Sequence, residues 1–216
     1  MDDEIKVTAN LQSFSEIRKK GLSLIKEMIC KEMNEITLID MYFIGLIDKS
    51  CFLIDGMIGA IKDINCVVVG ILLRGQMDNC LRALAITLTD NHQEFVTHVF
   101  KGEKISKFKD RDNKKMRDFY LIEKINCLDS KFKQVYERAC NYVHFSGVGM
   151  FHTLHNKGLE RKKLGISVGL RRAEDFSVIE EGSQAFLHYT ELLYKLVENW
   201  IKQKRDILHV KNETKI

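Results

Sequence analysis

The sequence predicts an all-α protein, an antiparallel helical bundle with a small β-hairpin before the C-terminal helix. Hydrophobic residues make up 45% of the 216 residues and charged residues 30%, a balance typical of a globular domain. The chain contains no proline, the residue that interrupts helices by removing a backbone donor. The segment 64–89 is apolar on nearly all sides, which predicts that it forms the buried centre of the bundle.

The first half of the chain is predicted to form helices connected by short turns. Ser13 or Ser15 can cap the first helix, and Asp90-Asn91 can cap the fourth, because short polar side chains accept hydrogen bonds from free backbone N–H groups. The expected helices cover residues 13–34, 37–63, 64–89 and 92–100.

The second half begins with a long basic loop at 101–117, followed by a helix at 118–126. The next helix is expected to start at Asp129-Ser130 and to end at Ser146-Gly147. Residues 148–156 and 164–170 are rich in β-forming residues and are predicted to pair as a hairpin. Ser177 can cap the final helix, which we expect to end near Leu208 and to leave a frayed tail over about 210–216. No composition break marks a second domain, so 1–216 is predicted to be one domain.

The cysteines and the N-terminus predict a cytoplasmic protein. None of the six cysteines forms a C-x-x-C pair, and we expect reduced thiols in the core. The N-terminus is acidic and lacks the apolar segment of a signal peptide. The longest apolar run, 66–73, is too short to cross a membrane, and we expect no membrane partner.

Positive charge is concentrated in two segments. Residues 101–117 hold eight basic and three acidic side chains, a net charge of +5. Residues 159–172 hold five basic side chains and one acidic side chain, a net charge of +4. Because the formal net charge of the whole chain is +4, all other residues together carry 4 − 9 = −5. Such segments suit phosphate backbones, and Phe108 could stack on a base. A solvated loop is the alternative interpretation. The candidate anion-binding residues in the first segment are Lys107, Lys109, Arg111, Lys114 and Lys115.

Three polar side chains near the end of the predicted 129–146 helix form the leading candidate site. Arg138, Asn141 and His144 are three residues apart, and each step of three moves only about 60° around a helix. They therefore form one slanted polar ridge. A cation, an amide and an imidazole can hold a phosphate and move a proton, which predicts nucleic-acid or nucleotide chemistry. The structural alternative is that Arg138 and Asn141 fix a helix end while His144 binds a backbone carbonyl.

A second polar set lies in the most apolar helix. Arg74, Asp78 and Arg82 are four residues apart and share one face. Buried charge is costly unless paired, so these residues could form an internal ion-pair network that fixes neighbouring helices. Alternatively this face opens toward His144, with Arg74 binding an anion and Asp78 orienting an imidazole or a guanidinium.

These motifs resemble an uncharacterised bacterial family of small helical proteins. The matching positions are Arg74-x-x-x-Asp78, Lys114-Lys-Met-Arg-Asp118 and the stretch from Tyr136 to His144-Phe-Ser, so the resemblance covers most of the chain. That family looks like a branch of the HEPN superfamily (higher eukaryotes and prokaryotes nucleotide-binding). The resemblance implies a helical bundle, commonly a homodimer, and in many members a metal-independent ribonuclease of toxin–antitoxin or phage-defence systems.

The HEPN signature is an arginine and a histidine separated by four to six residues, and Arg138-x₅-His144 matches it. Active members often have a polar residue directly after the arginine, whereas this chain has Ala139. By this resemblance Arg138 would neutralise the phosphorane, Asn141 would position a phosphate oxygen or the ribose, and His144 would transfer a proton. One histidine cannot be acid and base at once, so we expect two motifs to meet in a dimer, and we expect binding more than cleavage.

We expect no cofactor and no metal. A metal site could be formed by Cys140, His144, His152 and His155, but no standard zinc spacing appears.

The ridge, the basic segments and the resemblance together predict the leading function, a HEPN-like RNA-binding protein or endoribonuclease. Its expected partners are RNA or a nucleotide and an antitoxin or defence component. Two alternatives remain: a non-catalytic interaction module in which Arg74, Asp78 and Arg138 are structural, and a nucleotide-binding sensor.

Overall fold

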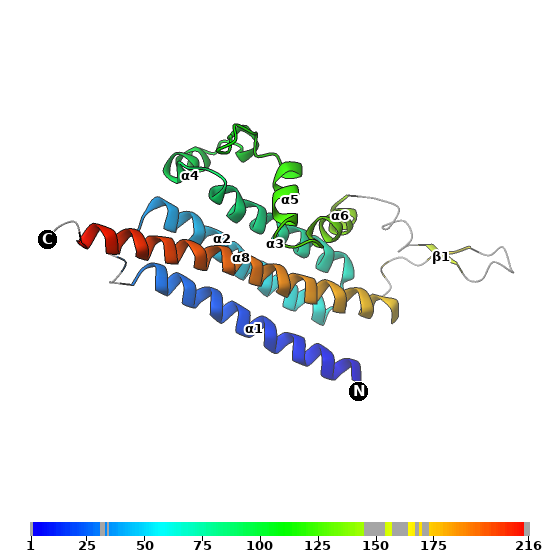
Figure 1. The fold of residues 1–216 in the computed structure, drawn as a ribbon. Helices are drawn as coiled ribbons and strands as arrows, with labels where there is room; N and C mark the ends of the chain where they lie inside the picture. Colours follow the sequence, from blue (N-terminus) through cyan, green and yellow to red (C-terminus); the bar gives the residue numbers. More distant parts are fainter. Residues whose placement is uncertain are drawn as a thin grey trace.

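The computed structural model describes residues 2–30, 33, 35–144, 154–156, 164–166, 169 and 173–213. Four long helices lie alongside one another, and three shorter helices cover one side of them (Figure 1). The long helices are α1 (Asp2–Met28), α2 (Leu38–Lys62), α3 (Cys66–Thr87) and α8 (Ala173–Glu213). The shorter ones are α4 (His92–Phe100), α5 (Asp118–Asn126) and α6 (Phe132–Val143). The predicted helical bundle is confirmed, but its expected antiparallel arrangement is wrong for α8, which runs parallel to α3.

Helix α3 occupies the centre of the bundle. It contacts α2 and α8 on one side and α4, α5 and α6 on the other. Thirteen of its 22 residues are buried, as its largely apolar sequence predicts. The three helices α1, α2 and α3 alternate in direction, whereas α8 runs parallel to α3 (Figure 1).

Two contacts establish the parallel pairing of α3 and α8. Cys66 Sγ lies 3.6 Å from Asp175 Oδ1 at the beginning of both helices. Fourteen residues further along each helix, Cys80 Sγ donates to the backbone carbonyl of Tyr189 at 3.0 Å. The chain between α3 and α8 therefore returns to the end of the bundle where α3 begins.

The predicted bounds of α2, α4 and α5 agree closely with the structure. Thr37 caps α2 in a capping box with Asp40, and Asp63 is its C-cap. Asn91 caps α4 by accepting a hydrogen bond from the N–H of Glu94 at 3.0 Å. These ends are defined by residues close in sequence, which is why sequence patterns locate them.

The predicted starts of the first and last helices are wrong. α1 begins at Asp2, and residues 2–12 contain no glycine or proline that would interrupt the helix. α8 begins at Ala173, so Ser177 lies inside the helix and does not cap it. α8 also continues to Glu213, through most of the segment for which the sequence predicts a frayed tail.

The end of α1 and the start of α6 also differ from the prediction. α1 ends at Met28 rather than near Asn34. The ammonium of Lys204 binds the backbone on both sides of the segment that follows: it lies 3.5 Å from the carbonyl oxygen of Met28 and 3.0 Å from that of Glu35. α6 begins at Phe132 and ends at Val143, and the expected stop at Ser146-Gly147 lies outside the described residues.

Of the predicted hairpin, the structure describes two short segments. β1 (Leu154–Asn156) and β2 (Leu164–Ile166) pair antiparallel, with His155 opposite Gly165. The rest of 148–156 and 164–170, apart from Gly169, lies outside the described residues, as does most of the second basic segment. Among the helices that are described, none combines the length and the hydropathy needed to cross a bilayer.

Candidate functional site: the polar ridge of α6

The ridge of Arg138, Asn141 and His144 lies on the side of α6 that faces away from α3. Ala139 is 2% exposed and packs on the other side, together with the buried Phe132. Arg138 and His144 are exposed, and Asn141 is half-buried. Arg138 and His144 thus lie on the accessible surface of α6, while Asn141 is partly covered.

His144 ends α6. Its backbone N–H donates to the carbonyl of Cys140 at 3.0 Å, and its φ of −104° and ψ of 140° take the chain out of the helix in an extended conformation. Within the described part of the chain, the side chains of Arg138 and His144 form no hydrogen bond or ion pair, whereas Asn141 does interact with a neighbour. Both terminal members of the ridge are exposed.

A small apolar cavity of about 160 Å³ opens beside Arg138. The ring of Tyr142 and the carboxylate-bearing Glu181 lie on its wall, and Gly70 and Gly182 allow α6 and α8 to approach α3 closely. Sequence reasoning misses Glu181 because it belongs to α8 and carries no local signal. The cavity places an apolar surface next to the arginine of the ridge.

Arg74 and Asp78 do not lie on the ridge. Their side chains form an ion pair with each other and are 16% and 29% exposed. The guanidinium carbon of Arg74 lies 3.7 Å from the centre of the Tyr136 ring, and its Nε donates to Cys140 Sγ at 3.2 Å. Arg74 therefore binds the flank of α6 that faces α3. Along the same face of α3, Arg82 forms an ion pair with Asp118 at 2.9 Å.

Replacing Arg74 by alanine is expected to lower the free energy of unfolding by about 2 kcal/mol, because the half-buried carboxylate of Asp78 loses its charged partner. The Tyr136 ring would also lose its cation. Urea denaturation of both proteins measures the difference. An Arg74→Ala variant as stable as the wild type, but unable to bind RNA, would instead show that Arg74 belongs to a binding site.

The basic loop 101–117 has a defined conformation that depends on Asp110. This residue is 7% exposed. Its Oδ1 accepts hydrogen bonds from the backbone N–H groups of Asp112 (3.0 Å) and Lys114 (2.8 Å). Its Oδ2 accepts one from the hydroxyl of Tyr120. Burial acts to raise the pKa of Asp110, but these hydrogen bonds outweigh it and the pKa is lowered. Burial and the bond to Asp110 raise the pKa of Tyr120 to about 12.

The loop exposes its predicted anion-binding side chains and partly covers its aromatic ring. The ring of Phe108 lies 5.3 Å from that of Phe95 and 5.2 Å from that of His98, and is half-buried. Phe108 thus packs against α4 and keeps only part of its ring exposed, and its stacking on a base stays a prediction. The exposed cations of this loop include Lys107, Lys109, Lys114 and Lys115.

Arg111 is exposed, yet much of its hydrogen-bonding capacity is already used. Its Nη2 donates to the carbonyl of Thr87 at 2.7 Å, its Nε lies 3.3 Å from the carbonyl of Leu88, and Asp90 lies 3.5 Å away. Arg111 thus covers the C-terminal end of α3. Gly70 of α3 packs on Tyr142 of α6. It lies 17 residues before Thr87, the last residue of α3, which is roughly 25 Å along the helix axis. The structure therefore separates Arg111 from the ridge.

The metal alternative depends on His152, which lies outside the described residues, and on the side chain of His155, which is also not described. Comparison with family models, with curated proteins and with solved structures finds no match for this chain.

Proposed function

We propose that the protein is an RNA-binding protein of the HEPN type whose contact with the phosphate backbone is centred on the α6 ridge. The observation that carries this proposal is the orientation of the ridge: Arg138 and His144 are exposed on the face of α6 opposite the buried Ala139. An arginine binds a phosphate through several N–H groups at once. The apolar cavity beside Arg138 adds a surface against which a sugar or base can pack.

Cleavage of the bound RNA would need no metal. Metal-free cleavage requires deprotonation of the 2′-hydroxyl, neutralisation of the phosphorane and protonation of the leaving oxygen. Arg138 supplies the positive charge, Asn141 orients the phosphate or ribose, and His144 transfers a proton. Because each chain has one such histidine on its ridge, a homodimer that brings two ridges together supplies the acid and the base. An antitoxin or another defence component would then control access to the ridge.

The lysines of loop 101–117 extend the proposed surface. Lys107, Lys109, Lys114 and Lys115 are exposed, and each contact with a phosphate releases counterions, so binding should weaken as salt rises. In this proposal the lysines contact phosphates of the same RNA beyond those held at the ridge.

Replacing His144 by alanine is expected to abolish RNA cleavage and to leave the melting temperature unchanged, since the imidazole is exposed and packs on nothing described. Arg138→Ala is expected to weaken RNA binding about tenfold or more, as loss of a charge-assisted hydrogen bond does. The measurements are cleavage of single-stranded RNA and binding by fluorescence anisotropy. Gln134→Ala is the matched control, because Gln134 is also an exposed residue of α6.

Intact RNA with the wild-type protein would exclude catalysis but not binding. Equal RNA affinity for wild type, Arg138→Ala and Gln134→Ala would contradict the ridge as a binding surface. The second candidate function, a non-catalytic interaction module, is favoured by the ion pair between Arg74 and Asp78, which serves helix packing. It gains support if Arg138→Ala lowers the melting temperature, an outcome that the exposure of Arg138 argues against.

A further inference from the structure

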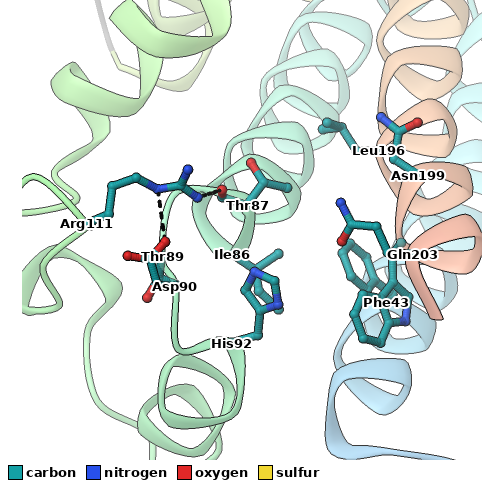
Figure 2. Close-up of a pocket in the computed structure, with 11 residues that line it drawn as sticks. Phe43, Ile86, Thr87, Thr89, Asp90, His92, Arg111, Leu196, Asn199 and Gln203 are labelled. Atoms are coloured by element: carbon teal, nitrogen blue, oxygen red, sulfur yellow. Dashed lines mark hydrogen bonds and ion pairs between the residues drawn. The ribbon is translucent and has the colours of Figure 1, made fainter. Parts of the chain in front are cut away.

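A second cavity, of about 270 Å³, lies at the opposite end of α3 from the ridge. Its floor is apolar and buried, and is made by Phe43, Ile86, Leu196 and Trp200. Its rim is polar: Figure 2 shows His92 and Arg111 on one side and Asn199 and Gln203 of α8 on the other. An apolar floor with a few polar groups around it is the usual composition of a small-molecule site, and this volume suits a small ligand.

The floor favours a planar aromatic ligand. The ring of Trp200 stacks on that of Phe43, with 6.1 Å between the centroids and 20° between the planes. The imidazole of His92 stands perpendicular to the Trp200 ring at 6.3 Å. The Trp200 Nε1–H donates to Asp40 at 2.8 Å, so the indole is fixed and offers the cavity only its apolar surface. Aromatic surfaces of this kind bind a flat ring in offset or edge-to-face contact.

The rim favours a neutral ligand. Arg111 is already bound to Asp90 and to carbonyls at the end of α3, so it has little capacity left for a free anion, while its charge repels a cation. Burial, and secondarily the charge of Arg111, lower the pKa of His92, so its imidazole is neutral near pH 7 and carries one donor and one acceptor.

The two amides on α8 determine the chemistry of recognition. Asn199 and Gln203 are four residues apart on one face of the helix, both are exposed, and neither amide forms a hydrogen bond with a residue that the structure describes. Each amide offers a donor and an acceptor. Paired donors and acceptors of this kind recognise the edge of a nucleobase in bidentate fashion.

We propose that this cavity binds a nucleobase, with its ring over the exposed part of Trp200 and its polar edge on Asn199 and Gln203. The base can belong to a free nucleoside or to an RNA strand. This site requires neither the α6 ridge nor RNA cleavage. Trp200 is the only tryptophan of the chain, so its fluorescence reports occupancy of the cavity directly.

The test is a titration of Trp200 fluorescence with adenosine, guanosine, cytidine and uridine, and with a short single-stranded RNA. We expect a saturable change with at least one nucleoside, or with the RNA alone if the base must belong to a strand. Gln203→Leu and Asn199→Leu keep the size of the side chain and remove its amide, and each should weaken binding about tenfold. Lys202→Ala alters a neighbouring exposed residue outside the cavity and should bind as the wild type does.

The proposal is overturned if no nucleoside and no RNA changes the fluorescence in a saturable manner, or if both leucine variants bind like the wild type. His144→Ala separates this site from the proposed function, because it should remove cleavage and leave the Trp200 response unchanged. Failure of the ridge and failure of the cavity thus give different results.

Discussion

Replacing Lys204 by methionine is expected to lower the free energy of unfolding by about 3–5 kcal/mol. The Lys204 ammonium lies 2.7 Å from Asp40 Oδ2, and the side chains are 6% and 0% exposed. Methionine fills a similar volume but leaves the Asp40 carboxylate in the core without a counter-ion. Breaking a buried pair in this way costs more than the pair itself contributes, because the remaining charge is still desolvated. Equilibrium urea denaturation measures the loss.

The next residue of α8 provides a matched control. Arg205 forms an ion pair with Glu27 of α1 at the same distance, 2.7 Å, but the side chains are 49% and 37% exposed. Arg205→Ala is expected to change stability by about 1 kcal/mol or less, since water screens exposed pairs. Equal losses for the two variants would contradict the importance of burial at Lys204.

The same carboxylate should make stability depend on acid. Burial acts to raise the pKa of Asp40, but hydrogen bonds from Lys204, from the backbone N–H of Thr37 and from the Trp200 indole outweigh it, and the pKa is lowered. A carboxyl group whose pKa is lower in the folded state contributes stability above its unfolded value, about 3.9, and loses it as pH falls through the folded value. When the pH falls from about 5 to about 2, the Asp40 carboxyl group takes up a proton. The Asp40→Asn variant should therefore lose less stability over this range than the wild type does. Identical slopes of stability against pH would contradict this assignment.

Replacing Gly70 by alanine is expected to destabilise the protein by about 1–3 kcal/mol or more. A Cβ at Gly70 would lie 2.7 Å from Cβ of Tyr142 and closer still to two carbons of its ring. Because Tyr142 belongs to α6, the substitution would push that helix away from α3 and displace the ridge. Thermal unfolding measures the loss of stability, and RNA affinity is expected to fall with it.

Gly45 is the control for this substitution. It lies inside α2, and a Cβ there meets nothing within 4 Å. Gly45→Ala should raise stability by roughly 0.5–1 kcal/mol, because alanine loses less backbone freedom than glycine when a helix forms. If both alanine variants stabilise the protein, α6 can move without cost and the close approach at Gly70 is not required.

Sequence patterns locate the features that depend on neighbouring residues. The capping box at Thr37 and the cap at Asn91 involve partners three residues away, and the exposure of the α6 ridge follows from helical spacing. The start of α1 is missed because Ser13 has the residue type of a cap but lies inside a helix that begins eleven residues earlier, in a stretch without glycine or proline.

Features that join distant segments are not predictable from spacing. Nothing near Asp40 indicates that Lys204 neutralises it, because 164 residues separate them. For the same reason the sequence does not show that Phe108 packs on Phe95, that Arg74 binds the flank of α6, or that Trp200 of α8 forms the floor of a cavity. Each of these requires the relative positions of helices, which are set by the whole core.

The parallel pairing of α3 and α8 also constrains how the protein is made. Among the described helices these two share the most extensive contact, and the bond between Cys80 and Tyr189 spans 109 positions. As the ribosome synthesises the chain from its N-terminus, α3 emerges long before its principal partner. The part of its apolar surface that α8 covers stays exposed until α8 has been translated. A nascent chain that stops before α8 is therefore a target for chaperones and proteases.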